Sequence, residues 1–133
     1  MIKKIEHIGI AVKDLKKSEE LFEKLLGEKS YKSEEVKSEG VTTSFFKLAD
    51  QKVELLHATS EESPISKFIQ KRKEGIHHLA LHVDSIKNEV ERLKALCFEF
   101  ISTTPKKGAD NKMIVFLHPK TTNGVLVELC EEI

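Results

Sequence analysis

An internal repeat constrains the fold of this chain more than any other feature of its sequence. The segment EHIGIAVKDLKKSEELFEKL, which begins at Glu6, is echoed by HHLALHVDSIKNEVERLKAL, which begins at His77. Each copy contains a His, an apolar run ending in Val, an Asp, and then an amphipathic helical pattern. We expect Asp14 and Asp84 to cap the two helices, and Leu21, Phe22 and Leu25 to share one face of the first. The chain therefore consists of two copies of one structural unit.

The remainder of each copy is predicted to form strands, which cover residues 40–48 and 52–58 in the first copy and 113–119 and 124–130 in the second. Between the copies, Ser63 can cap a helix that begins with Pro64, which predicts a linker helix over about residues 63–73. The predicted fold is α+β, with two tandem βαβββ modules that form a cupped mixed sheet with its helices outside. Residues 1–133 make one domain, with module 1 at about 3–58 and module 2 at about 76–131.

Charge and hydropathy exclude several classes of partner. The 22 basic and 22 acidic side chains balance, so neither nucleic acid nor an anionic membrane is expected as a partner. No apolar run is long enough to span a membrane, and no signal peptide is apparent at the N-terminus. The two cysteines, Cys97 and Cys130, do not resemble a secreted disulfide framework. We therefore expect a cytoplasmic protein.

Four polar residues interrupt apolar strands at matched places in the two copies. His7 and Glu54 are 47 positions apart, and His78 and Glu128 are 50 positions apart. Because strand residues alternate between faces, all four side chains are predicted to point away from the face that carries the apolar residues. A carboxylate there would be costly without a partner.

Two imidazoles and two carboxylates form a mixed nitrogen and oxygen site that suits Zn, Ni, Co, Fe or Mn. Any one of these residues alone would be interpreted as structural, but four at matched positions predict one divalent metal per chain, bound by His7, Glu54, His78 and Glu128. His82 could act as a partner of a ligand or as a substitute ligand, and Cys130 could be a reactive thiol, but a structural role is favoured for both. His57, His77 and His118 are also interpreted as structural.

The duplicated βαβββ pattern with these four residues resembles the glyoxalase and bleomycin-resistance superfamily, the vicinal-oxygen-chelate proteins, over nearly the whole chain. Within that superfamily, the segments SPISKFIQKRKEGIHHLALHV and FLHPKTTNGVLVEL are similar to methylmalonyl-CoA epimerases. The four ligands equally resemble the metal set of glyoxalase I, the lactoylglutathione lyases. Some epimerases carry a further catalytic glutamate in the strand that is here GVTTSFFKL, which has no carboxylate and has Thr43 near the expected place.

The resemblance implies a metal-dependent enzyme that moves a proton on a carbon next to a carbonyl, through an enediolate or enolate. The main expectation is a glyoxalase I type lyase that acts on a glutathione hemithioacetal and detoxifies methylglyoxal. The alternative is a methylmalonyl-CoA epimerase, which acts on a CoA thioester. Glu128 is the first candidate for the base, and Glu54 is the second. Nickel or cobalt is the favoured metal, with zinc and manganese as further options.

Two other functional classes stay open beside these enzymes. A bleomycin-resistance type protein would use the same fold to sequester a ligand without a metal. A ring-cleaving dioxygenase would need two His and one carboxylate on iron, and the fourth ligand, Glu128, counts against it. The superfamily resemblance also implies a homodimer. Substrate anions could meet Lys106, Lys107 and Lys112, although a solvated group of charges is favoured.

Overall fold

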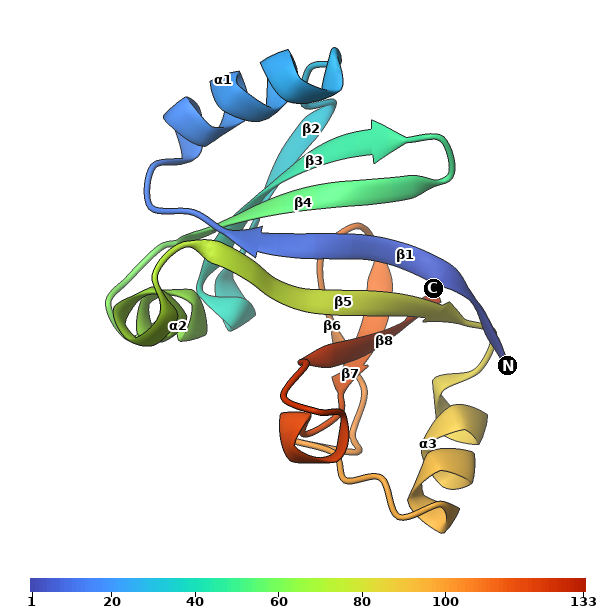
Figure 1. The fold of residues 1–133 in the computed structure, drawn as a ribbon. Coiled ribbons are helices and arrows are strands. Elements are labelled where there is room, and N and C mark those ends of the chain that lie inside the picture. The colour runs from blue at the N-terminus through green and yellow to red at the C-terminus, as the bar shows by residue number, and fades with distance from the viewer. The chain divides into compact units, whose positions relative to one another are not determined.

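The computed structural model describes residues 1–133 and has a mixed α+β architecture with eight strands and three α-helices. The chain divides into two compact units. The continuous unit comprises Ile8–His77, and the split unit comprises Met1–His7 together with His78–Ile133. Two strands, β1 (Ile2–Ala11) and β5 (Gly75–Val83), both labelled in Figure 1, contribute residues to both units. The predicted α+β class and the repeated β-α-β-β-β order are confirmed.

The continuous unit contains α1 (Leu15–Leu26), β2 (Lys32–Val36), β3 (Val41–Leu48), β4 (Gln51–Ala58) and α2 (Pro64–Arg72). The three strands form an antiparallel meander in which β3 pairs with both β2 and β4. A short 3-10 helix, Lys37–Glu39, connects β2 to β3. The predicted linker helix is present as α2, with Ser63 accepting a hydrogen bond from the backbone N–H of Ile65.

Helix α1 begins and ends where local chemistry predicts. The carboxylate of Asp14 accepts a hydrogen bond from the backbone N–H of Lys17 at 3.0 Å, and Gly27 ends the helix with a φ of 74°, a conformation that glycine adopts without strain. The expected apolar face was partly wrong. Phe22 packs towards the buried residues of the continuous unit, whereas Leu21 and Leu25 are exposed.

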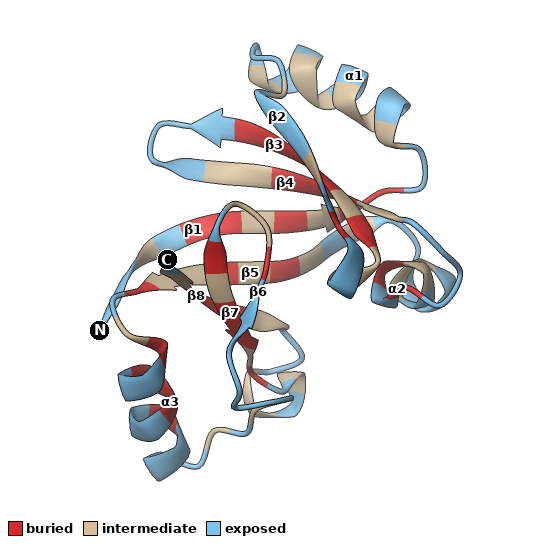
Figure 2. Cartoon of the chain, turned by 180° about the vertical axis from the view of Figure 1, so that it is seen from behind, coloured by how far each residue is buried: buried red, intermediate tan, exposed pale blue.

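The split unit contains α3 (Ile86–Ala95), β6 (Lys106–Lys107), β7 (Lys112–Phe116) and β8 (Val127–Glu132), with a 3-10 helix at Pro119–Thr121. Strand β8 pairs in parallel with β5 and antiparallel with β7, which in turn pairs antiparallel with β6. Helix α3 buries one face and exposes the other (Figure 2). The residues of this core are Val83, Ile86, Val90, Leu93, Val115, Leu117 and Leu129.

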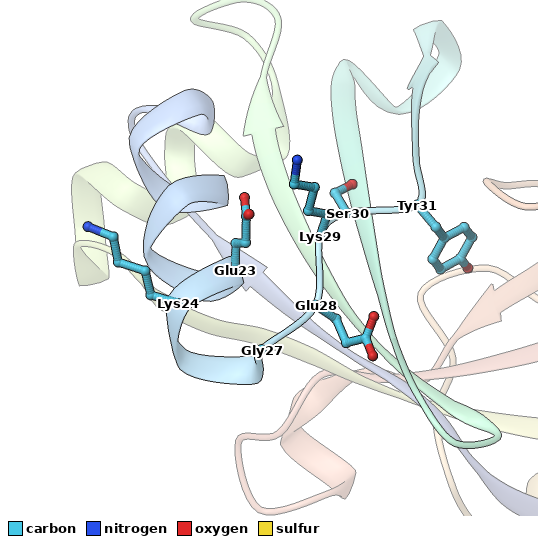
Figure 3. Close-up of a pocket in the computed structure, with 7 residues that line it drawn as sticks. All are labelled: Glu23, Lys24, Gly27, Glu28, Lys29, Ser30 and Tyr31. Atoms are coloured by element: carbon cyan, nitrogen blue, oxygen red, sulfur yellow. The ribbon is translucent and has the colours of Figure 1, made fainter.

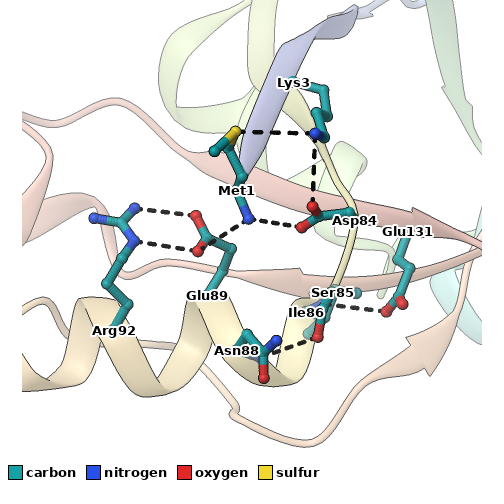
Figure 4. A network of polar contacts seen from close by, with 9 residues as sticks. All are labelled: Met1, Lys3, Asp84, Ser85, Ile86, Asn88, Glu89, Arg92 and Glu131. Carbon is teal, nitrogen blue, oxygen red and sulfur yellow. Dashed lines mark hydrogen bonds and ion pairs between the residues drawn. The ribbon is translucent and has the colours of Figure 1, made fainter.

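The N-cap of α3 differs from the expectation. Ser85, and not Asp84, accepts the hydrogen bond from the backbone N–H of Asn88, at 3.2 Å. Asp84 instead accepts a hydrogen bond from the amino group of Met1 at 2.6 Å, and its second oxygen lies 3.7 Å from Nζ of Lys3 (Figure 4). No helix of the chain combines the length and the apolar character that a membrane crossing requires.

Candidate metal centre

The split unit brings together three of the four predicted metal ligands. His7 comes from β1, His78 from β5 and Glu128 from β8, and each is about 5% exposed. The Nε2 atoms of the two histidines lie 2.9 Å apart. The two oxygens of Glu128 lie 3.8 Å from Nε2 of His7 and 3.6 Å from Nε2 of His78. The three side chains therefore converge on one small buried volume.

Strand alternation in β5 and β8 explains why these side chains share a face. Val83 and Leu129 point to the apolar core beneath α3. Ala80 and Cys130 lie in a separate buried cluster with Ile114. His78 has the same parity as Ala80, and Glu128 the same parity as Cys130, so both are placed on this second face. The parity predicted from the sequence is confirmed here.

Small and aromatic neighbours shape the second face. Ala80 lies opposite Glu128 in the β5–β8 register, so its neighbour on the β5 side is a small methyl group. Phe116 lies opposite Glu128 on the other side, in the β7–β8 register. Its ring meets the imidazole of His78 edge to face, with centroids 5.9 Å apart and planes at 89°. This contact restricts the orientation of His78.

The three residues fit a divalent metal. Two nitrogen ligands at the usual distance of about 2.05 Å, at right angles around one ion, would be separated by about 2.9 Å, which is the separation that His7 and His78 show. The ligand atoms of the three residues all lie within 4.8 Å of one another. Lone pairs brought so close in a buried place repel one another unless a cation or a proton lies among them. The donor set, two imidazoles with a carboxylate, suits a divalent transition metal.

The fourth predicted ligand, Glu54, belongs to β4 of the continuous unit. Its side chain is 4% exposed, and it lies opposite Phe45 in the β3–β4 register. Its neighbours Val53 and Leu55 pack in the apolar cluster of that unit, so alternation directs Glu54 to the other face, as the sequence predicts. A role for Glu54 as a ligand stays a prediction.

Sequence reasoning missed Glu6. This residue is 4% exposed, and its Oε1 lies 2.8 Å from Nδ1 of His7. Strand alternation concealed the pairing, because consecutive residues of a strand are expected to point to opposite faces. The available signal was a carboxylate in an apolar strand immediately before a candidate metal ligand.

Two of the other histidines make structural contacts. The half-buried ring of His77 packs edge to face against Phe68, with centroids 4.9 Å apart. Burial lowers the pKa of His77 to about 4, so this side chain is neutral at physiological pH. His118 accepts a hydrogen bond from the backbone N–H of Lys120 at 3.1 Å. These contacts agree with the structural roles expected for both residues.

Cys130 and Lys112 have partners of their own. Sγ of Cys130 donates a hydrogen bond to the carbonyl oxygen of Leu81 at 3.5 Å, and the residue is fully buried. Lys112 is also buried, and its Nζ lies 3.8 Å from a carboxylate oxygen of Asp110. Lys106 and Lys107 are exposed in β6. A contact between these lysines and a substrate stays a prediction.

A surface hollow in the continuous unit contains none of the predicted ligands. It lies where α1 ends and the chain turns towards β2 (Figure 3). The residues that line it are Glu23, Lys24, Gly27, Glu28, Lys29, Ser30 and Tyr31. None of these residues is buried, so the hollow does not provide the buried donors that the proton-transfer chemistry requires.

Comparison with known proteins decides the family. The profile of the Glyoxalase/Bleomycin resistance protein/Dioxygenase superfamily matches residues 6–116. The chain belongs to this superfamily. A mitochondrial methylmalonyl-CoA epimerase from Dictyostelium discoideum is 43% identical over 132 residues, which cover 98% of this chain and 80% of the relative.

Solved structures agree with this relationship. The methylmalonyl-CoA epimerase of Mycobacterium tuberculosis superposes with a TM-score of 0.94 at 30% identity, covering 99% of this chain and 89% of its own. A methylmalonyl-CoA epimerase in complex with methylmalonyl-CoA and NH4+ also gives a TM-score of 0.94, at 29% identity, covering 99% of this chain and 96% of its own. The resemblance to vicinal-oxygen-chelate proteins is therefore confirmed.

These relatives correct the main functional expectation. A glyoxalase I type lyase acting on a glutathione hemithioacetal was the wrong interpretation, because the relatives are epimerases of CoA thioesters. The physical reason is that the two activities share a fold, a metal set and a first chemical step, so the ligands alone do not distinguish their substrates. The expectation of nickel rested on the glyoxalase I resemblance, and the relatives do not support it.

Proposed function

We propose that this protein is a methylmalonyl-CoA epimerase that inverts the carbon next to the thioester carbonyl. The observation that carries the proposal is the 43% identity to the Dictyostelium discoideum epimerase along almost the whole chain. The site chemistry supports it independently. His7, His78 and Glu128 offer two imidazole nitrogens and one carboxylate within 4.8 Å of one another, in a buried place where water competes poorly.

The reaction requires removal of a weakly acidic C–H proton and its return on the opposite face. A divalent metal in this site would supply positive charge that favours loss of a proton beside the thioester carbonyl. His7 and His78 would hold this ion, because both direct Nε2 to one point. Glu128 would accept the substrate proton. Its carboxylate has two oxygens, so one could bind the metal while the other takes the proton.

Inversion needs a proton donor on the second face of the planar enolate. We assign this role to Glu54, because it matches Glu128 in the sequence repeat and is a buried carboxylate in an apolar strand. In one direction Glu128 removes the proton and Glu54, in its acid form, delivers one. In the other direction the two residues exchange roles. After each turnover the protonated glutamate releases its proton to solvent and the other takes one up, so both return to their starting states.

The decisive experiment is a direct assay on a single epimer of methylmalonyl-CoA. The purified protein is supplied with cobalt, zinc, manganese or nickel in turn, and conversion to the other epimer is followed by chiral chromatography in deuterated water. We expect conversion with deuterium at the inverted carbon. Succinyl-CoA, a CoA thioester without that stereocentre, serves as a substrate control for chemical exchange. No conversion with any of these metals would contradict the proposal.

A second assay separates this function from its closest competitor in the superfamily. The same metal-loaded samples are mixed with the hemithioacetal of methylglyoxal and glutathione. We expect no turnover, because an epimerase has no need to recognise the glutathione carrier. The identity of the native metal, the cytoplasmic location and the homodimer stay predictions that accompany the proposal.

A further inference from the structure

Glu6 and His77 occupy the same place in the two halves of the repeat, each directly before a metal-ligand histidine. Their chemistry differs. Glu6 is a buried carboxylate bonded to Nδ1 of His7 at 2.8 Å. His77 instead packs its ring edge to face against Phe68. The two copies of the repeat therefore differ at the position directly before the ligand histidine.

We propose that Glu6 is a positioning residue that fixes His7 as the tautomer with its proton on Nδ1, which leaves the Nε2 lone pair directed at the metal. A carboxylate accepts hydrogen bonds and cannot donate one, so the bond of 2.8 Å requires the proton to be on Nδ1 of His7. The opposite nitrogen is then the lone-pair donor. This nitrogen is the one that lies 2.9 Å from His78 and 3.8 Å from Glu128.

The arrangement also has an energetic consequence. A carboxylate bonded to the far nitrogen of a ligand histidine orients the ring and makes its other nitrogen a stronger donor, and loss of such a partner typically weakens metal binding by about 10- to 100-fold. Because Glu6 and His7 are both about 5% exposed, solvent does not weaken the bond. The position before His78 carries His77 instead, so the sequence repeat places a carboxylate directly before only one of the two histidines.

The inference deepens the proposed function, since it rests on the metal dependence of that function. Its test uses Co²⁺ and no CoA thioester, so failure of the epimerase assay and failure of this inference are separate results. The dissociation constant for Co²⁺ is measured by competition with a chromophoric chelator, in the wild type and in Glu6→Gln. We expect the substitution to raise the dissociation constant by about 10- to 100-fold.

A matched control separates this effect from general destabilisation. Glu89→Gln makes the same chemical change at another buried carboxylate of the split unit, which is 3% exposed and bonded to Arg92 in α3 (Figure 4). We expect it to leave the Co²⁺ dissociation constant within about threefold of wild type. Equal losses in both variants would overturn the inference. So would an affinity in Glu6→Gln that matches wild type.

Two spectroscopic readouts complete the test. The visible spectrum of bound Co²⁺ reports the number of ligands, and we expect the same band shape in Glu6→Gln and wild type at saturating metal. A change to a lower coordination number would make Glu6 a ligand and overturn the positioning role. In metal-free wild type, long-range ¹H–¹⁵N correlation of His7 should show the ring proton on Nδ1. A proton on Nε2 would overturn the inference even if Glu6→Gln did not fold.

Discussion

The Nε2 atoms of His7 and His78 lie 2.9 Å apart, although 71 positions of sequence separate the two residues. Their rings are nearly perpendicular, at 85°, so they do not stack, and each ring directs one nitrogen towards the other residue. Glu128 completes this arrangement from the neighbouring strand β8. The two histidines at matched positions of the repeat thus lie together as a pair of nitrogen donors.

Substitution of Glu128 should separate catalysis from metal binding. Glu128→Gln keeps an oxygen that can bind a metal but removes the basic carboxylate. We expect epimerase turnover to fall by about 10²- to 10⁴-fold, the usual range for a lost general base, while most of the metal is retained. Initial rates and metal content by atomic absorption provide the measurement. The comparison variant is His7→Ala, which should lose metal and activity together. Nearly full turnover in Glu128→Gln would assign the base elsewhere.

Substitution of Glu54 should reveal whether two bases act on opposite faces. In Glu54→Gln, Glu128 can still remove a proton from one epimer and return it to the same face. We therefore expect solvent deuterium to enter the substrate carbon of one epimer while the other epimer exchanges slowly and net inversion is lost. Proton NMR of each epimer in deuterated water measures both rates. Equal exchange of the two epimers in this variant would argue for a single base.

Removal of the metal should lower the thermal stability of the protein. A metal present at about 100 times its dissociation constant stabilises the folded state by about 2.7 kcal/mol, which corresponds to a melting temperature increase of roughly 10 °C in a chain of 133 residues. Calorimetry of the Co²⁺-loaded protein with and without excess chelator measures this difference. His7→Ala should melt at one temperature in both conditions. An equal response to the chelator in that variant would place the stabilising metal outside the centre.

The Glu89 and Arg92 pair predicts a dependence of stability on pH. Two hydrogen bonds from Arg92, both 3.1 Å long, lower the pKa of Glu89 below its ordinary value of 4.5, and the nearby Met1 amino group acts in the same direction. The folded state therefore binds fewer protons than the unfolded state near this pH. The ion pair therefore stabilises the folded state at pH values above 4.5. This stabilisation disappears as the pH falls through the lowered pKa that Glu89 has in the folded state.

We expect Glu89→Gln to reduce the free energy of unfolding by about 1 to 2 kcal/mol at pH 7, a value discounted for the exposure of Arg92. The difference from wild type should shrink as the pH falls from about 5 to 3. Urea denaturation at several pH values measures it. Glu91→Gln, an exposed change on the same helix, should have little effect at any pH. A difference that is constant with pH would contradict the assigned ion pair.

Features that depend on neighbouring residues could be predicted from the sequence. Asp14 and Ser63 cap their helices because a capping side chain needs only backbone N–H groups two or three positions away. His78 and Glu128 share a face because strand alternation is a local property of an extended chain. The repeat then identified which polar residues belong together, since two copies of one unit place matched residues in equivalent positions.

Choices between equally suitable residues were decided by the tertiary structure. Asp84 and Ser85 are both good capping residues, and Ser85 caps α3 because Asp84 meets the amino group of Met1, 83 positions away. Leu21 and Leu25 match a helical apolar pattern, yet they are exposed because the buried cluster contacts Phe22 on another side of α1.

The metal centre divides in the same way between sequence and structure. The sequence by itself determined the candidate ligands His7, His78 and Glu128, because their periodicity is a property of extended strands. Only the tertiary structure showed that their donor atoms converge and that Glu6 is bonded to Nδ1 of His7, against strand alternation. The distance between donor atoms depends on strand pairing across the chain, and a periodic pattern within one strand contains no information about it.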